Sequence, residues 1–192
     1  MISIIDYNAG NTLSVKNAFG RLGCETNITN DIDQLNKSDK LILPGVGDAS
    51  YAMKKLNASG LISFIKQTKK PILGICLGMQ LMCRYSEEGN TPCLGIFDIV
   101  VKQFPSTERV PHIGWNEVHD LSGRLMQLNN ENDDVYFVHS YYVPLSVWTS
   151  SRANYILPFS ASIERENFYA TQFHPEKSGK IGEAILKNFL AL

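Results

Sequence analysis

Pro71-Ile72-Leu73-Gly74-Ile75-Cys76-Leu77-Gly78-Met79-Gln80 is the stretch on which the fold of this 192-residue chain depends. It predicts a short buried strand that breaks at Cys76 and continues as a helix. Gly74 and Gly78 flank the cysteine two residues away on either side, the spacing of a G-x-S-x-G nucleophile elbow with sulfur in place of oxygen. A nucleophile on so tight a turn has strained backbone angles and needs small neighbours, while the helix N-terminus favours a thiolate. The alternative interpretation is a buried structural cysteine, so the rest of the chain has to supply catalytic partners.

The composition is that of an ordinary globular protein. Hydrophobic residues make up 44% of the chain and charged residues 19%, and the length fits one domain over residues 1–192. The net charge of −1 gives no reason to expect nucleic acid or an anionic membrane as a partner. The N-terminus lacks a basic region and a cleavage site, and no apolar run is long enough to cross a bilayer. We therefore expect a cytoplasmic protein.

The cysteines do not suggest a metal site. Cys24, Cys76, Cys83 and Cys93 include no C-x-x-C pair, which argues against bound zinc, and they suit a reducing compartment as free thiols. Cys83 lies seven residues after Cys76. We expect it two turns further along the same helix, in the core, and we assign no chemistry to Cys24 or Cys93.

The first half of the chain alternates between predicted strands and predicted helices. The strands cover residues 2–6, 26–29, 40–43 and 72–75, and the helices cover residues 12–22, 48–56 and 61–68. This alternation predicts an α/β fold with a mostly parallel sheet and helices on both of its faces. Ligands of such sheets bind beyond the carboxyl ends of the strands, where both Cys76 and Pro44-Gly45-Val46-Gly47 lie.

The second half is rich in aromatic and β-branched residues. Predicted strands cover residues 96–104, 110–119, 135–143, 160–166 and 169–173, and a last helix covers residues 181–190. We expect these strands to form antiparallel hairpins that complete one side of the sheet.

A downstream segment supplies what a catalytic cysteine needs. His174 can take the thiol proton and later protonate a leaving amine, and Glu176, two residues on, can hold the imidazole in the useful tautomer. Acyl transfer also needs hydrogen-bond donors for an oxyanion. The glycine-rich segment 44–47 and the Leu77 N–H at the helix start are the natural candidates. Without these partners, an isolated His-x-Glu pair or a glycine-rich turn has an ordinary structural explanation.

These motifs together resemble the class I (triad) glutamine amidotransferases. The resemblance rests on Pro44-Gly45-Val46-Gly47, Gly74-Ile75-Cys76-Leu77-Gly78-Met79-Gln80 and Gln172-Phe173-His174-Pro175-Glu176. Two further motifs, residues 111–116 and 136–142, look like those of the glutaminase subunits of imidazole glycerol phosphate synthases, which serve histidine biosynthesis. The similarity runs over nearly the whole chain. It implies a flavodoxin-like three-layer sandwich, with a mostly parallel central sheet and antiparallel strands added in the C-terminal half.

The resemblance also implies roles for individual residues. Cys76 matches the family's nucleophile, His174 its general base and Glu176 the orienting carboxylate. The other matches are Gly45, Val46 and Leu77 in the oxyanion-hole region; Gly45, Gln80, His139, Ser140 and Tyr141 around the glutamine; and Asn8, Asn11, Trp115, Tyr136 and Lys177 at the partner interface near the ammonia exit. Without the resemblance, Trp115 and Tyr136 would be ordinary sheet aromatics and Lys177 a solvated surface residue.

The implied reaction is thiolate attack on the side-chain amide of L-glutamine, release of ammonia and hydrolysis of the thioester to glutamate. The implied partner is a cyclase with a (β/α)8 barrel, which forms a heterodimer with this chain and receives the ammonia through a channel. There it would make imidazole glycerol phosphate and the purine intermediate AICAR, which is lyase as well as hydrolase chemistry. Neither step on this chain calls for a metal or an organic cofactor.

One departure from the family pattern bears on the pathway. Family members usually carry a Tyr-Gly pair ahead of the strand near residue 160, where this chain has Asn154-Tyr155-Ile156-Leu157-Pro158. The alternative function is that of a paralogous glutaminase subunit that supplies ammonia to a sugar amidotransferase for surface polysaccharide or flagellar glycan. Hydrolase-like relatives with a cysteine elbow usually have a His directly after the Cys, where this chain has Leu77. A non-catalytic binding subunit would not need Cys76, His174 and Glu176 together.

Overall fold

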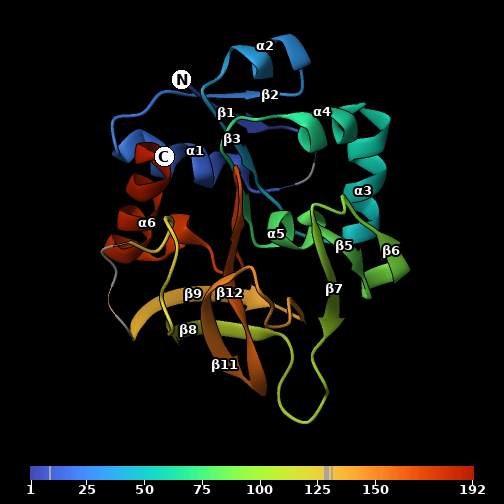
Figure 1. Ribbon diagram of the computed structural model, residues 1–192, viewed down its shortest axis with the longest axis vertical. Coiled ribbons are helices and arrows are strands. Elements are labelled where there is room, and N and C mark those ends of the chain that lie inside the picture. The colour runs from blue at the N-terminus through green and yellow to red at the C-terminus, as the bar shows by residue number, and fades with distance from the viewer. Residues whose placement is uncertain (9, 128–129, 131) are drawn as a thin grey trace.

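The computed structural model describes residues 1–8, 10–127, 130 and 132–192, and it shows an α/β fold (Figure 1). The helices are α1 (Thr12–Arg21), α2 (Ile32–Lys37), α3 (Ala49–Ala58), α4 (Leu61–Gln67), α5 (Leu77–Met82) and α6 (Gly179–Ala191). The strands are β1 (Ile2–Ile5), β2 (Thr26–Thr29), β3 (Lys40–Leu43), β4 (Ile72–Ile75), β5 (Cys83–Ser86), β6 (Thr91–Pro92), β7 (Phe97–Gln103), β8 (His112–Val118), β9 (Asp133–His139), β10 (Tyr141–Tyr142), β11 (Thr149–Tyr155), β12 (Leu157–Arg165) and β13 (Phe168–Thr171).

The central sheet has seven strands in the order β11-β12-β13-β4-β3-β1-β2. The strands from β13 to β2 pair in parallel, and β12 and β11 add antiparallel pairings at one edge. This arrangement confirms the predicted mostly parallel sheet with antiparallel strands from the C-terminal half. It also places the carboxyl ends of β3, β4 and β13 side by side.

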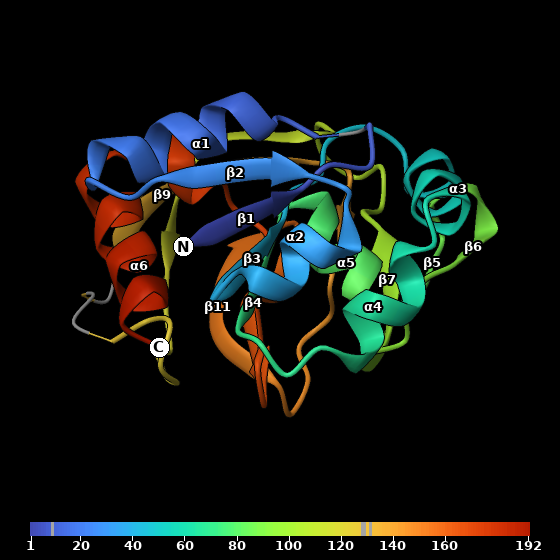
Figure 2. The same ribbon diagram turned by 90° about the horizontal axis from the view of Figure 1, so that it is seen from above.

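Helices cover both faces of the sheet, as predicted. On one face, Ile4 and Ile42 pack in a core cluster with Phe19 of α1 and Phe189 of α6. The other face packs against α2, α3, α4 and α5. Figure 2 shows α1 and α6 together on one side of the parallel strands and α3 and α4 on the other. Adjacent residues of one strand enter opposite clusters because successive side chains point to opposite faces.

The prediction that all C-terminal strands complete one side of the main sheet is wrong. β7 and β10 belong to a second sheet of order β10-β7-β5-β6, and β8 pairs with β9 in a separate antiparallel ribbon. β13 runs parallel to β4 and lies inside the main sheet, between β4 and β12. Alternation identified these segments as strands, but it carries no information on which partner each strand finds.

The prediction that Cys83 continues the helix after Cys76 is also wrong. α5 ends at Met82, and Cys83 opens β5, where it pairs with Phe97 of β7. All six residues of α5 are buried, so they carry no amphipathic pattern that could mark the end of the helix. Cys83 is nevertheless fully buried, as expected for a core residue.

α2 and β11 are among the elements that the sequence did not predict. α2 buries a single residue, Leu35, too few for a helical periodicity. β11 reads Thr-Ser-Ser-Arg-Ala-Asn-Tyr, a polar run without the apolar alternation of a strand. Its buried hydroxyls are satisfied across the pair with β12, because Ser150 and Ser151 both contact the Ser162 hydroxyl, at 2.7 and 2.6 Å.

The departure at residues 154–158 forms the turn between β11 and β12. Ile156 has a φ of 60° at this turn. That backbone region suits glycine and strains a β-branched residue. The chain therefore retains the turn without the glycine that would relieve the strain.

Candidate active site

Cys76 lies at the junction of β4 and α5 in a strained backbone conformation. Its φ is 54° and its ψ is −107°, a combination that L-residues rarely adopt. The Cys76 N–H donates to the Thr171 carbonyl at 2.8 Å, and the Cys76 carbonyl accepts the N–H of Met79 at 3.0 Å. The sequence predicted this sharp turn. It lifts the sulfur out of the regular strand while the backbone on both sides stays hydrogen-bonded.

The glycines around Cys76 are required by close backbone approach. A Cβ on Gly74 would lie 2.9 Å from the carbonyl carbon of Gly78. A Cβ on Gly78 would overlap the carbonyl oxygen of Leu43 at the end of β3. The two glycines therefore let α5 start directly against β3 and β4, which fixes where its first N–H groups point.

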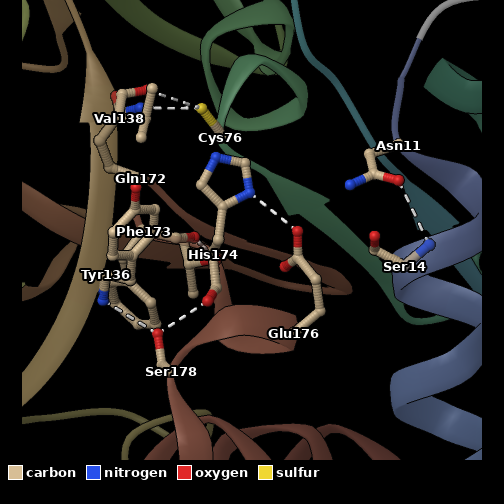
Figure 3. Close-up of polar contacts among 11 residues, drawn as sticks. Asn11, Ser14, Cys76, Tyr136, Val138, Gln172, Phe173, His174, Glu176 and Ser178 are labelled. Carbon is tan, nitrogen blue, oxygen red and sulfur yellow. Dashed lines mark hydrogen bonds and ion pairs between the residues drawn. The ribbon is translucent and has the colours of Figure 1, made fainter. Parts of the chain in front are cut away.

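His174 and Glu176 form a buried pair directed at the cysteine. Figure 3 shows the His174 ring between Cys76 and Glu176, with Nδ1 2.8 Å from Glu176 Oε1. The two side chains are 4% and 1% exposed. Burial alone lowers the pKa of His174, but hydrogen bonds and charge interactions with Cys76 and Glu176 outweigh it and raise the pKa to about 10. The geometry therefore suits a protonated His174 between Cys76 and Glu176.

The ribbon strand β9 holds the backbone of the histidine segment. The His174 N–H donates to the Tyr136 carbonyl at 2.9 Å. The Ser178 hydroxyl donates to the His174 carbonyl at 2.7 Å and accepts the Tyr136 N–H at 3.0 Å. The position of the imidazole is thus tied to the same strand that carries the Tyr136 ring.

The segment from Pro44 to Gly47 packs against the start of α5. A Cβ on Gly45 would lie 2.6 Å from the Gly78 nitrogen and 2.7 Å from Leu77 Cβ. The Tyr7 hydroxyl fixes the segment by donating to the Pro44 carbonyl at 2.6 Å. Gly45 and Leu77, both predicted for the oxyanion hole, are therefore neighbours. The exposed Val46 lines a pocket beside Cys76.

A pocket of about 290 Å³ opens in front of the sulfur. Its lining contains residues that the sequence nominated for the nucleophile, base, oxyanion hole and glutamine site: Cys76, His174, Val46, Leu77, Gln80, His139, Ser140 and Tyr141. Gly45 and Glu176 are not among the lining residues. The volume is small for a ligand pocket and suits a molecule of amino-acid size. A larger cleft of about 730 Å³ beside α1 and β2 contains none of the nominated residues.

Two of the residues nominated for glutamine act on one carbonyl. Gln80 Nε2 and His139 Nδ1 lie 3.0 and 2.7 Å from the Tyr141 carbonyl oxygen. The Ser140 carbonyl accepts the Phe104 N–H at 3.0 Å. The backbone of residues 139–141 is therefore tightly held where it borders the pocket, as a binding edge requires.

Three residues nominated for the partner interface form one group. Trp115 is 57% exposed and meets the Tyr136 ring edge-on at 5.9 Å between centroids, and Lys177 Nζ lies 5.8 Å from the centre of the Tyr136 ring. The other two nominated residues lie elsewhere, at the start of α1. Asn11 caps that helix by accepting the Ser14 N–H, and Asn8 is exposed with a φ of 59°. Figure 3 shows Asn11 across from Glu176.

Several residues of the site had no role assigned from the sequence. Glu88, Pro111 and Val138 also line the pocket, as does Gly47 of the predicted oxyanion segment, and the Gln172 side chain contacts Cys76. Burial, and then the charge of Asp48, raises the pKa of Glu88, although a hydrogen bond from the Ala49 N–H opposes the shift. Glu88 follows another glutamate in a polar turn, a setting typical of solvated residues, so only the fold reveals its position.

The described residues contain neither a metal-ligand cluster nor a membrane-spanning helix. Across residues 1–8, 10–127, 130 and 132–192, no three His, Cys, Asp or Glu side chains are grouped so that they could hold a metal ion. Over the same ranges, no helix combines the length and the apolar character that crossing a membrane demands.

The family model and the related proteins that match this chain agree on one family. A family model described as "Glutamine amidotransferase class-I" matches residues 3–192. The chain is 55% identical to the imidazole glycerol phosphate synthase subunit HisH of Bacteroides fragilis (strain YCH46), with 100% of this chain and 99% of that protein covered. It is 47% identical to the protein of the same name from Haemophilus influenzae (strain 86-028NP), with 98% and 96% covered.

Solved structures show the same fold at low sequence identity. A crystal structure of a glutamine amidotransferase matches with a TM-score of 0.77 and 18% identity, covering 99% of this chain and 97% of that one. A chain of the PurLQS structure from Thermotoga maritima matches with a TM-score of 0.75 and 17% identity, covering 99% and 97%. At these identities the likeness supports the fold alone.

Proposed function

Because the chain belongs to the class-I glutamine amidotransferase family, and within it to the family of imidazole glycerol phosphate synthase HisH subunits, we propose that it hydrolyses L-glutamine with Cys76 as nucleophile. The observation that carries the proposal is the buried Cys76–His174–Glu176 arrangement at the floor of a pocket of amino-acid size. The nucleophile, the base and the orienting group meet there as acyl transfer requires.

In the proposed mechanism, the Cys76 thiolate attacks the side-chain carbonyl carbon of glutamine. The N–H groups of Leu77 and of the Gly45–Val46 segment stabilise the oxyanion. His174, held by Glu176, gives its proton to the departing ammonia, and a thioester forms. Water, deprotonated by His174, then attacks the thioester and releases glutamate, which returns the thiolate and the imidazolium.

Glu88 is the residue that we propose for the α-ammonium group of glutamine. Among the described residues that line the pocket, it is the only glutamate or aspartate, and the Ala49 N–H holds one of its oxygens at 2.8 Å. A carboxylate in a small pocket with limited solvent is a strong partner for an ammonium group. Backbone groups of residues 139–141 would bind the rest of the amino acid.

The ammonia is proposed to pass to a cyclase subunit with a (β/α)8 barrel, in a heterodimer that makes imidazole glycerol phosphate and AICAR. The group of the exposed Trp115 and Lys177 with the half-buried Tyr136 between them supports a docking surface beside the site. Asn8 and Asn11 are proposed as further partner contacts. Because ammonia becomes unreactive ammonium in bulk water, a direct transfer between subunits protects the nucleophile. No cofactor is needed, and a cytoplasmic location is proposed with the pathway.

Glutamine turnover in the presence of different partners tests this function. The chain is assayed for glutamate release alone, with the histidine-pathway cyclase and its nucleotide ligand, and with a cyclase-like partner of a sugar amidotransferase. We expect low turnover alone and about 5- to 150-fold stimulation by the histidine-pathway cyclase, the range of ordinary allosteric couplings.

Two results of this assay would contradict the proposal. Stimulation by the sugar-pathway partner alone would move the chain to the paralogous function. Equal turnover under all three conditions would refute control of the site by a partner. The Lys177→Ala variant, compared with Lys180→Ala on α6, serves as a matched pair, and only the Lys177 change should weaken stimulation.

A further inference from the structure

Gln172 is fully buried and bridges the cysteine and the glutamine-binding edge of the pocket. Its Nε2 lies 3.7 Å from Cys76 Sγ, an ordinary distance for a hydrogen bond to sulfur, and its Oε1 accepts from Gln80 Nε2 at 3.0 Å. Figure 3 shows this contact with Cys76 on the side of the sulfur away from α5. One amide thus contacts both the nucleophile and a residue of the pocket lining.

The contacts of Gln80 determine which of its atoms a ligand can meet. A carboxamide nitrogen has two hydrogens. In Gln80 one of them is directed to Gln172 Oε1 and the other to the Tyr141 carbonyl, both at 3.0 Å. The remaining polar atom of the amide is Oε1, a hydrogen-bond acceptor. As long as Gln172 presents its own oxygen, Gln80 cannot turn its amide over without losing two hydrogen bonds.

A pair of histidines fixes the other end of this network. His139 Nδ1 lies 2.7 Å from the Tyr141 carbonyl, which can only accept, so Nδ1 carries the hydrogen and Nε2 is left as an acceptor. His112 Nδ1 donates to that acceptor at 3.1 Å. Burial lowers the pKa of His139 to about 3 and that of His112 to about 4, so both rings are neutral near pH 7. The tautomers of both rings are therefore determined, and the Tyr141 carbonyl, which can only accept, orients the Gln80 NH2 group toward itself.

On the side of Cys76 Sγ that faces Val138 and Gln172, a thiolate needs a hydrogen-bond donor. The Val138 carbonyl oxygen lies 3.7 Å from Cys76 Sγ, where it can accept from a thiol but would repel a thiolate. Gln172 supplies the opposite preference, because an amide N–H stabilises a thiolate more than a thiol. Among the described residues, His174 and Gln172 are the two whose side chains donate a hydrogen bond to the sulfur.

We infer that Gln172 is a positioning residue of the glutaminase site. Its oxygen holds the Gln80 amide so that an acceptor faces the substrate, and its N–H supports the thiolate of Cys76 against the Val138 carbonyl. This inference deepens the proposed function and rests on it for the part that concerns glutamine. The effect on Cys76 stands on the geometry alone.

Two variants separate the two roles. Gln172→Met removes both hydrogen bonds at similar size, whereas Gln172→Glu keeps an acceptor for Gln80 but places a negative charge beside the sulfur. Alkylation of Cys76 by iodoacetamide, followed by mass spectrometry over a range of pH without glutamine, reports thiolate formation. We expect Gln172→Met to lower the alkylation rate at pH 7 about tenfold and to move the profile to higher pH, with a larger displacement for Gln172→Glu.

Steady-state turnover in the complex with the cyclase supplies the second readout. Gln172→Met should raise the KM for glutamine about tenfold, because the Gln80 amide becomes free to turn. Gln172→Glu should keep the KM nearer that of the wild type while it lowers kcat further. The KM should change more in Gln172→Met, whereas the reactivity of Cys76 should change more in Gln172→Glu. A residue with a merely structural role would not give opposite orders for the two quantities.

A matched control lies at the other end of β13, the strand that Gln172 directly follows. Asn167 also makes two side-chain hydrogen bonds, donating to the Thr68 and Lys70 carbonyls at 3.0 and 2.8 Å, near the start of β13. Asn167→Leu should lower the thermal stability and leave both the alkylation profile and the KM unchanged. Wild-type alkylation in Gln172→Met together with an unchanged KM would overturn the inference.

A measurement on the unsubstituted side chain covers the case in which the variants fold poorly. The side-chain NH2 signal of Gln172 in a nuclear magnetic resonance spectrum should move with pH in the wild type and stop moving in Cys76→Ala. A signal that does not respond to Cys76 would refute the contact. If the complex did not hydrolyse glutamine at all, the proposed function would fail while the alkylation and resonance experiments still decided the role of Gln172 on Cys76.

Discussion

Cys76→Ala is expected to abolish glutamine hydrolysis in the complex with the cyclase, lowering turnover by about 10⁴-fold or more. Among the described residues that line the pocket, Cys76 alone has a sulfur atom, and a thioester cannot form without it. The fold should survive, because alanine keeps the Cβ at the strained position and removes one atom from a nearly buried site. Glutamate release and circular dichroism check the two statements.

The cyclase reaction supplies an internal control for this variant. With free ammonium at high pH in place of glutamine, the complex with Cys76→Ala should still form product, since ammonia can reach the cyclase from solution. Cys24→Ala removes a sulfur far from the pocket, beside α1 and β2, and should keep glutamine turnover. Residual turnover above about 1% of the wild type in Cys76→Ala would contradict the assigned nucleophile.

Gly78→Ala is expected to have the largest effect on folding. The added methyl group would overlap the Leu43 carbonyl oxygen at the end of β3, a backbone atom that cannot turn away as a flexible side chain could. Forced overpacking of this kind should lower the free energy of unfolding by about 3 kcal/mol or more, or about 6 to 12 °C in Tm. The shift of α5 would also displace the Leu77 N–H, so glutamine turnover should fall in any protein that still folds.

Gly20→Ala is the matched control for this change. Gly20 lies in α1, is exposed, and a Cβ there would meet no atom within 4 Å. Alanine is the better helix former, so this variant should raise the free energy of unfolding by about 0.5 to 1 kcal/mol. Thermal or urea unfolding of both variants gives the comparison. A Gly78→Ala protein as stable as the wild type would show that α5 does not start where the structure places it.

The sequence was most informative where backbone geometry restricts the residue type. A cysteine with a glycine two residues away on each side has few explanations, so the turn at Cys76 could be predicted from the spacing. The structure gives Cys76 the positive φ that such a turn requires. The alternation of strands and helices in the first half likewise predicted the parallel sheet, because short connections leave few topologies. His174 and Glu176 were predicted from the motif as partners of Cys76, and the structure brings both side chains beside the cysteine.

The parts that could not be predicted depend on long-range pairing. Nothing local distinguishes β13, which enters the middle of the sheet, from β7, which leaves it for a second sheet. β11 is polar because its serine hydroxyls bond across to β12, and the end of α5 has no amphipathic signal because both of its faces are buried. Gln172 and Glu88 stayed without a role for the same reason, since their partners are residues distant in the sequence.

Covalent labelling by a glutamine analogue is the sharpest test of Cys76 as the nucleophile. The wild-type complex is incubated with a diazoketone analogue of glutamine, and the adduct is located by mass spectrometry, with excess L-glutamine as competitor. We expect one adduct, on Cys76 and not on Cys24, Cys83 or Cys93, and we expect glutamine to suppress it and Cys76→Ala to abolish it. No adduct on Cys76, with or without the cyclase, would contradict it.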